Sequence, residues 1–294
     1  GGGDGFRVLK HPSKNIIYSE MQGAANVWRY DVDNSLVKTV QPLPRDGHAK
    51  LRFNWNAPMA ISVHQPDRFY MGSQFLHVSE DMGDSWTIIS PDLTTNDTNK
   101  QQQEDSGGLS MDNSGAENHT TIYTIAESPL DANVIWVGTD DGNVQVTKNG
   151  GKTWLNTIEN ISGLPKNTWV YHIEASSHDK ATAYVVFEGH TSGDMTPYTY
   201  KTTDYGKTWK NIITDDVVGF VRNIQEDFVN PDLLFLGTEF GLYITLDGGT
   251  TWNKFTKNMP SVAVHFIDLQ KQTNDLVMGT HGRGVIIIDD ISPL

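Results

Sequence analysis

The sequence of 294 residues predicts an all-β fold, a β-propeller of four-stranded blades, and three observations lead to this prediction. A turn pattern of eight residues occurs four times, a β-type run with a glycine turn precedes each copy, and the repeats follow one another at blade-like spacing. A four-stranded blade cannot bury both of its faces alone, so neighbouring units have to stack around a common axis. Six blades can be counted along the chain.

The recurring turn reads Ser/Thr-x-Asp/Asn-x-Gly-x-Ser/Thr-Trp and occurs at residues 79–86, 147–154, 202–209 and 245–252. The Asp or Asn side chain accepts amide hydrogen bonds within its own turn, the Gly two residues later adopts a positive φ, and the Trp buries a large surface. The pattern therefore predicts a hairpin fastened to a core, and we refer to these four segments as the stapled turns. A scaffold role is expected for Asp81, Asn149, Asp204 and Asp247.

The expected blades lie near residues 5–42, 56–90, 120–157, 168–214, 219–256 and 262–294, with an insertion loop over 90–119. The first unit has Tyr30-Asp31-Val32-Asp33-Asn34 where a stapled turn is expected, and the last unit ends in the apolar run 285–288 after three strands. These two irregular ends predict a single domain that is part of a larger or incompletely closed propeller. The missing N-terminal part of the same protein is then expected as a partner.

The composition argues against several classes of protein. Lys and Arg number 22 against 36 Asp and Glu, and the net charge of −14 would repel a nucleic acid backbone. No cysteine is present, so disulfides and thiolate metal sites are excluded. No apolar run approaches the length of a membrane span.

No cofactor or metal site is expected. The ten histidines include no HExxH motif and no close pair of ligands. The insertion loop 90–119 carries many side-chain oxygens, including those of Asp92, Asp97 and Asp112, and such oxygens suit calcium. Their spacing matches no EF-hand loop, so calcium is the one ion that the sequence leaves open.

The stapled turns, together with the segments Gly237–Tyr243 and Gly279–Gly284 and the pair Asp289-Asp290, resemble bacterial secreted proteins with BNR or Asp-box repeats that are related to the sortilin ligand-binding propeller. The resemblance covers residues 2–294 and implies an extracellular, cell-surface or periplasmic location. Many such proteins are labelled glycosyl hydrolases. Asp-box propellers include sialidases, xyloglucan-cleaving hydrolases, sortilin-type receptors and a photosystem assembly factor, so the resemblance is specific for the fold and leaves the activity open.

The candidate site residues lie at one end of the expected blades, where the turns between the second and third strands meet the links between blades. The stapled turns join the third and fourth strands and therefore lie at the opposite end. The first end collects paired carboxylates, histidines and an aromatic side chain, which are the groups that a sugar or peptide site uses. The candidates for ligand binding are Asp140, Asp141, Trp169, His172, Glu188, His190, Glu239, His281 and Arg283.

Two functions from different classes follow from these residues. The first is a binding protein without catalysis that holds a protein or glycan ligand at this end of the blades. The alternative is a polysaccharide-cleaving glycoside hydrolase whose catalytic carboxylates are two of Asp140, Glu188 and Glu239. A sialidase is disfavoured because few arginines fall at this end. Each candidate also has a structural interpretation, as a solvated turn residue or a cap of local backbone amides.

Overall fold

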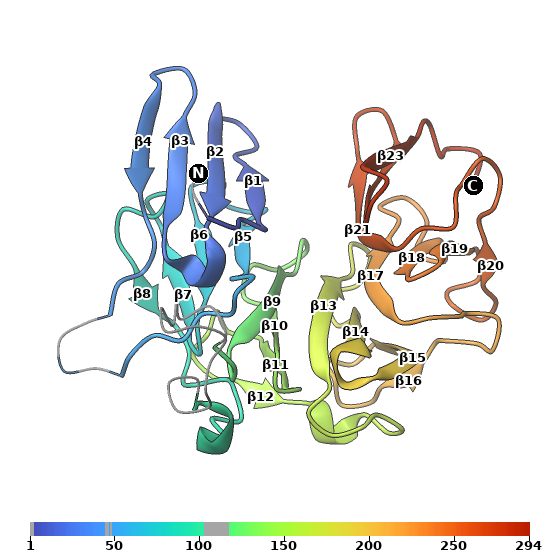
Figure 1. Ribbon diagram of the computed structural model, residues 1–294, viewed down its shortest axis with the longest axis horizontal. Helices are drawn as coiled ribbons and strands as arrows, with labels where there is room; N and C mark the ends of the chain where they lie inside the picture. Colours follow the sequence, from blue (N-terminus) through green and yellow to red (C-terminus); the bar gives the residue numbers. More distant parts are fainter. Residues whose placement is uncertain (1–2, 45–46, 48, 103–117) are drawn as a thin grey trace. The chain divides into compact units, whose positions relative to one another are not determined.

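The computed structural model describes residues 3–44, 47, 49–102 and 118–294. Within these ranges the chain forms 23 β-strands and four short 3-10 helices, and the strands are grouped into six antiparallel sheets (Figure 1). The predicted fold class is confirmed, because these sheets are the blades of an all-β propeller fold with almost no helix. None of the helices in the described ranges is long and apolar enough to cross a membrane.

The blades follow one another along the chain, and each is a meander of consecutive strands. The first blade comprises β1 (Val8–Lys10), β2 (Ile16–Glu20), β3 (Val27–Asp31) and β4 (Leu36–Thr39). The second comprises β5 (Met59–Ile61), β6 (Phe69–Gly72), β7 (Leu76–Ser79) and β8 (Thr87–Ile88). The third comprises β9 (Ile122–Glu127), β10 (Ile135–Thr139), β11 (Val144–Thr147) and β12 (Leu155–Asn156). The fourth blade comprises β13 (Trp169–Ala175), β14 (Ala183–Gly189), β15 (Asp194–Thr202) and β16 (Lys210–Asn211). The fifth comprises β17 (Val221–Glu226), β18 (Leu234–Thr238), β19 (Gly241–Thr245) and β20 (Asn253–Lys254). The sixth comprises β21 (Val264–Gln270), β22 (Asp275–Thr280) and β23 (Val285–Ile288). The helices are η1 (Gln22–Ala24), η2 (Thr98–Lys100), η3 (Ile158–Asn160) and η4 (His190–Ser192). The last blade has three strands, as the sequence predicts.

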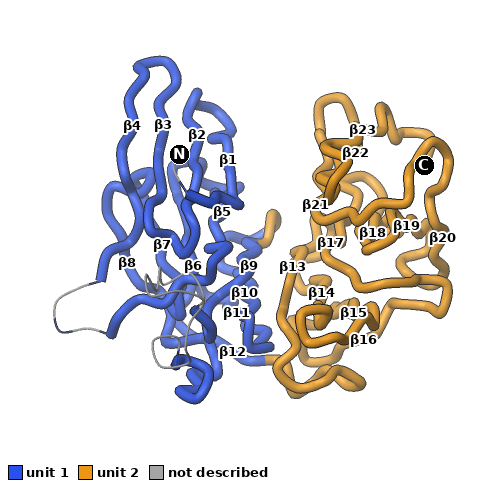
Figure 2. Tube along the Cα trace, in the orientation of Figure 1, with its two compact units in different colours: residues 1–127, 131–156 blue, residues 128–130, 157–294 orange. Residues whose placement is uncertain are grey.

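The chain divides into two compact units (Figure 2). The first unit comprises residues 1–127 and 131–156 and holds the first three blades, and the second comprises residues 128–130 and 157–294 and holds the last three. Each unit has its own buried hydrophobic clusters.

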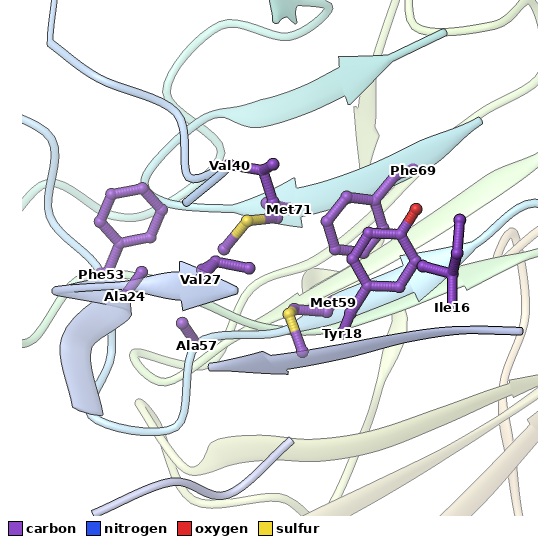
Figure 3. Close-up of a cluster of buried hydrophobic side chains, with 10 residues drawn as sticks. All are labelled: Ile16, Tyr18, Ala24, Val27, Val40, Phe53, Ala57, Met59, Phe69 and Met71. Atoms are coloured by element: carbon purple, nitrogen blue, oxygen red, sulfur yellow. The ribbon is translucent and has the colours of Figure 1, made fainter. Parts of the chain in front are cut away.

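The core of each unit lies between adjacent sheets. Figure 3 shows a cluster of the first unit, in which the ring of Tyr18 on β2 stacks on the ring of Phe69 on β6 with centroids 4.5 Å apart. Val27 on β3 and Met71 on β6 are fully buried in the same cluster. Burial of one large apolar side chain contributes about 1.5–3 kcal/mol, so packing of blade on blade is a main source of stability.

The stapled turns have the predicted position and internal bonding. The first of them joins β7 to β8, which are the third and fourth strands of their blade. Asp81 accepts from the hydroxyl of Ser79 at 2.7 Å, and from the backbone N and hydroxyl of Ser85 at 2.8 and 2.6 Å. These hydrogen bonds lower the pKa of Asp81 to about 2. The carboxylate is therefore ionised, and its hydrogen bonds come from residues of its own turn.

The Trp of a stapled turn also ties its blade to the preceding one, which the sequence did not reveal. The indole Nε1 of Trp86 donates to the carbonyl of Val40 at 2.7 Å, and Trp252 donates to the carbonyl of Ile212 at 2.7 Å. The glycine of the turn is needed for the same close approach. At Gly151, where φ is +92°, a Cβ would lie 2.5 Å from the carbonyl oxygen of Ile89.

A glutamate at the end of the first strand of a blade also links neighbouring blades. In the first unit, Glu127 accepts from the hydroxyl of Tyr70 at 2.9 Å and from the hydroxyl of Ser62 at 2.7 Å. In the second unit, Glu226 accepts from the hydroxyls of Tyr184 at 3.0 Å and Ser176 at 2.9 Å. The same inter-blade contact therefore occurs once in each unit.

Candidate functional site

A β-bulge recurs at the same position in the first strand of the last four blades. In β9, β13, β17 and β21 the register with the second strand shifts, and the pairing skips one residue of the first strand. A bulge re-aims the side chain of the extra residue and is common beside functional sites. The four extra residues are Tyr123, Tyr171, Arg222 and His265.

In the second unit the side chain of Arg222 is the centre of a polar cluster. Its Nη1 donates to the hydroxyl of Tyr171 at 3.3 Å and to Nδ1 of His265 at 3.2 Å, and its Nη2 donates to Nε2 of His190 at 3.3 Å. The guanidinium carbon lies 5.0 Å from the ring centre of Tyr171 and 5.2 Å from that of Phe220, which are cation–π distances. We refer to Tyr171, His190, Phe220, Arg222 and His265 as the Arg222 cluster.

The guanidinium of Arg222 is incompletely satisfied. Within the described part of the chain its hydrogen-bond partners are one hydroxyl and two imidazoles, and it has no ion pair with a carboxylate. Its Nε atom is buried and has no acceptor among the described residues. A buried donor without an acceptor costs about 1–3 kcal/mol, so an acceptor that reaches Nε would be favourable.

His190 connects Arg222 to a buried carboxylate. Glu188 near the end of β14 is 2% exposed, and it accepts from the backbone N of His190 at 2.8 Å and from the ring Nδ1. Because Nδ1 carries the proton, Nε2 is free to accept from Arg222. Burial and the charge of Arg222 lower the pKa of His190, against an opposing effect of Glu239. The imidazole is therefore neutral at pH 7.

His265 is a second neutral imidazole beside the guanidinium. Its ring centre lies 5.3 Å from that of His281. Burial, and then the charges of Arg222, His281 and His190, lower the pKa of His265 to about 4. Since both imidazoles are neutral, neither of them repels Arg222 at neutral pH.

Glu239 and His281 occupy equivalent backbone positions in the fifth and sixth blades. The backbone N of Glu239 donates to the carbonyl of Phe220 at 3.0 Å, and that of His281 donates to the carbonyl of Ala263 at 2.9 Å. Glu239 is half-buried and His281 is exposed. Gly219, where φ is +83°, permits the approach to Glu239, because a Cβ there would lie 3.0 Å from its Oε2.

In the first unit the equivalent position holds Asp140, which is fully bonded. Its backbone N donates to the carbonyl of Thr121 at 3.0 Å. The buried carboxylate accepts from Nδ2 of Asn54 at 2.9 Å and from the backbone N and hydroxyl of Thr121 at 2.8 and 2.5 Å. Burial raises the pKa of Asp140, and the charge of His119 and the bonds from Thr121 oppose this shift. The carboxylate holds the link before β9 in place.

The neighbouring carboxylate of Asp141 has a similar role. It is 1% exposed and accepts from the backbone N and hydroxyl of Thr95 at 2.8 and 2.7 Å, and from the hydroxyl of Thr139 at 2.5 Å. Asp141 therefore fastens the start of the insertion loop to the turn between β10 and β11.

The other predicted residues belong to the second unit. Trp169 is half-buried and pairs with Glu188 in the ladder between β13 and β14. Nε2 of His172 lies 3.1 Å from the carbonyl oxygen of Ile224. Arg283 is exposed in the turn between β22 and β23.

The structure brings Glu188 and His190 into direct contact with each other and places His281 against the Arg222 cluster. It assigns Asp140 and Asp141 to the first unit. The cluster residues Tyr171, Phe220, Arg222 and His265 were not among the predicted site residues. A signal for them exists, because a large polar or aromatic residue follows the first Ile or Val of four successive repeats, in Ile122-Tyr123, Val170-Tyr171, Val221-Arg222 and Val264-His265.

The described residues contain no group of three or more His, Cys, Asp or Glu side chains placed to hold a metal ion. In the insertion loop 90–119, Asp92 accepts from Nη2 of Arg52 at 2.9 Å and Asp97 accepts from the backbone N of Asn99 at 3.0 Å. Asp112 lies outside the described residues. Calcium binding by this loop therefore stays a prediction.

No family model matches the sequence. One curated relative is the oligoxyloglucan-reducing end-specific xyloglucanase of Emericella nidulans, which is 22% identical over 271 residues. The match covers 83% of this chain and 29% of that protein, so the chain spans less than a third of the length of this relative.

Solved structures share the fold at low sequence identity. The GH74 xyloglucanase from Xanthomonas campestris has a TM-score of 0.64 and 17% identity, over 95% of this chain and 44% of the other. An extracellular domain from B. thetaiotaomicron has a TM-score of 0.63 and 14% identity, over 98% of this chain and 32% of the other. The expected relation to hydrolase-like propellers is confirmed at the level of the fold. The narrower BNR and sortilin-like assignment stays a prediction.

Proposed function

We propose that this chain is a non-catalytic binding module for a glycan, and that it works outside the cytoplasm as a secreted, cell-surface or periplasmic protein. The glycan binds at the end of the second unit where the turns between second and third strands lie, with the Arg222 cluster at its centre. Glu239, His281 and Arg283 border the bound sugar, and Trp169 and His172 belong to the same end of the blades.

The observation that carries this proposal is the set of unused hydrogen-bonding groups beside aromatic rings. Arg222 retains an unsatisfied Nε and is flanked by Tyr171 and Phe220. Sugars bind through their hydroxyls to such polar groups and through their ring faces to aromatic side chains. The neutral imidazole of His265 adds a donor at the same place, because its Nδ1 accepts from Arg222 and its Nε2 carries the proton, whereas both ring nitrogens of His190 are already bonded.

The state of the carboxylates favours binding over hydrolysis. A glycosidase needs two carboxyl groups that are free to act on either side of the scissile bond. Of the three candidates, Glu188 is buried and bonded to His190, and Asp140 is buried and accepts three hydrogen bonds. Glu239 alone of the three is half-buried rather than buried.

A glycan is preferred over a protein ligand because the curated relative is a xyloglucanase. The similarity is weak and covers part of that protein, so it supports the class of ligand and not the particular polysaccharide. Location outside the cytoplasm is supported by the similarity in fold to an extracellular domain.

The test is a binding and turnover screen with the 294-residue chain. Neutral and acidic polysaccharides are cast into native gels for affinity electrophoresis, and the same panel is assayed for the release of reducing ends. We expect at least one polysaccharide to retard the chain and none to be cleaved. The change Phe220→Leu removes the buried ring that packs on His190 and Arg222, and should weaken retardation by loosening the cluster, whereas Phe6→Ala in the first unit should not.

Two results would contradict the proposal. Release of reducing ends that stops in Glu188→Ala, Glu239→Ala or Asp140→Ala would make the protein a hydrolase. A folded chain that is retarded by no polysaccharide of the panel, but is captured by peptides, would make the ligand a protein.

A further inference from the structure

We infer that the Arg222 cluster is a carboxylate site, and that the glycan bound by this chain contains uronic acid residues. This inference rests on the proposed glycan binding and names the class of sugar that the same site takes. It follows from the charge of Arg222, from the neighbours of its guanidinium and from its free donors.

Arg222 differs from Arg29 and Arg52, whereas half-buried Arg7 likewise donates to a neutral group, Oδ1 of Asn56 at 3.0 Å. In the first unit Arg29 lies 3.0 Å from a carboxylate oxygen of Asp84, and Arg52 lies 2.9 Å from one of Asp92. Arg222 has only neutral hydrogen-bond partners in the described part of the chain. A charge that is partly removed from water without a direct ion pair is costly, so Arg222 gains from an anion that contacts its guanidinium.

The surrounding groups limit the charge of that anion. The carboxylate of Glu188 is bonded to His190 on the far side of the ring from Arg222, and Glu239 acts on His190 through space. These two carboxylates repel a bound anion, and they repel a doubly charged phosphate more strongly than a singly charged carboxylate. A sugar carboxylate meets this limit.

The unused donors suit the two oxygens of a carboxylate. The guanidinium has five N–H donors, and the three observed hydrogen bonds leave Nε–H and one Nη2–H unused. Nε–H and one N–H of Nη2 form one edge of the guanidinium plane, the edge that binds a carboxylate with two parallel hydrogen bonds. A carboxylate that replaces the ring of His190 as acceptor for Nη2 also reaches the buried Nε.

The aromatic rings place a sugar ring next to the carboxylate. Phe220 stacks on the ring of His190 with centroids 4.7 Å apart, and Tyr171 lies on the guanidinium. In a uronic acid the carboxylate is attached directly to the sugar ring. Phe220 is buried beneath this contact, whereas Tyr171 is half-buried, so the carboxylate can be bound by Arg222 while the sugar ring lies against Tyr171.

The test compares each acidic sugar with its uncharged ester. Isothermal titration calorimetry of the 294-residue chain is performed with trisaccharides of galacturonate, glucuronate and mannuronate, and with the methyl ester of each. We expect one free acid to bind at least about tenfold more tightly than its ester, because a charge-assisted hydrogen bond contributes about 1.5–3 kcal/mol. The change Arg222→Gln should remove this difference, and Arg222→Lys should retain part of it.

Arg68→Gln is the matched control, since Arg68 pairs with Glu80 in the first unit and the change also removes one positive charge. Equal binding of acid and ester, or an acid preference that survives Arg222→Gln, would overturn the carboxylate site while glycan binding stands. Tight binding of a neutral xyloglucan oligosaccharide alone would do the same. If no sugar binds and an acidic peptide does, the proposed function itself fails, and the uronate inference fails with it.

Discussion

The third and fifth blades use the same backbone position in opposite ways. In both, the residue after the second strand donates its backbone N to the carbonyl that precedes the first strand, at 3.0 Å for Asp140 and 3.0 Å for Glu239. Around Asp140 the polar groups bond one another, whereas beside Glu239 the guanidinium of Arg222 keeps an unsatisfied donor. The repeat therefore determines where a side chain stands, and the neighbouring segments determine whether it is available to a ligand.

The largest expected effect on stability is that of a substitution at Asp140. The change Asp140→Ala removes the acceptor for three buried donors, and should lower the free energy of unfolding by about 3 kcal/mol. The matched change Glu239→Ala at the equivalent position should cost about 0.5 kcal/mol or less, because that side chain is partly exposed. Urea unfolding followed by tryptophan fluorescence measures both. Equal losses in the two variants would show that the positions do not differ as the structure indicates.

The next effect concerns the pH dependence of ligand binding. The pKa of His265 is about 4 and that of His190 is lowered in the unliganded chain, and a carboxylate at Arg222 should raise both. A complex that binds protons more readily than the free protein is stabilised as the pH falls. Affinity for the acidic sugar should therefore rise about tenfold between pH 7 and pH 5. The charged and titratable groups around the guanidinium are Tyr171, Glu188, His190, Glu239, His265 and His281.

The variant His265→Asn tests the origin of that pH dependence. Its amide oxygen can accept from Arg222 as Nδ1 does, but it cannot take up a proton in this range. Calorimetric titrations from pH 5 to pH 7 should give a flatter profile for this variant than for the wild-type chain. An unchanged profile would assign the titration to another group.

A smaller effect is expected at the stapled turns, which contrast with the Arg222 cluster because their polar groups are saturated. Asp81→Asn should cost about 1 kcal/mol at pH 7, since the amide oxygen still accepts but the charge is lost. The pKa of Asp81 is about 2, below the ordinary value of 3.8, so its ionised form stabilises the fold above about pH 4. The stability difference between wild type and variant should shrink as the pH falls from 4 to 2. Thermal melts over this range measure it.

The smallest expected effect is that of Arg222 on stability. Because its guanidinium has no direct ion pair in the described structure and leaves Nε unsatisfied, Arg222→Gln should change the free energy of unfolding by about 0.5 kcal/mol or less. The same variant loses the preference for the acidic sugar. A loss of several kcal/mol on urea unfolding would instead make Arg222 a structural residue.

The fold was predictable because its signals are local. An Asp or Asn, a Gly and a Trp at fixed spacing specify a turn whatever the rest of the chain does, so Asp81 and Trp86 could be assigned correctly from sequence. The inter-blade bonds of Trp86 to Val40, and of Glu226 to Tyr184, join residues far apart in the chain. No local pattern reveals such pairs.

The candidate site was predictable only in part. The turn residues Glu188, His190, Glu239 and His281 could be grouped because they occupy the same place in each repeat. Arg222 could not be assigned, because its orientation depends on a bulge in β17 that appears only in the pairing with β18. The burial of Asp140 depends likewise on links whose path the sequence does not specify.

Hydrogen–deuterium exchange of the 294-residue chain, with and without the best-bound uronate trisaccharide, shows which end of the blades the ligand contacts. If the ligand binds at the Arg222 cluster, we expect slower exchange in peptides that contain residues 169–172, 188–193, 219–223 and 263–266, and no change in the four stapled turns. Protection confined to the first unit or to the stapled turns, with no change around Arg222, would contradict it.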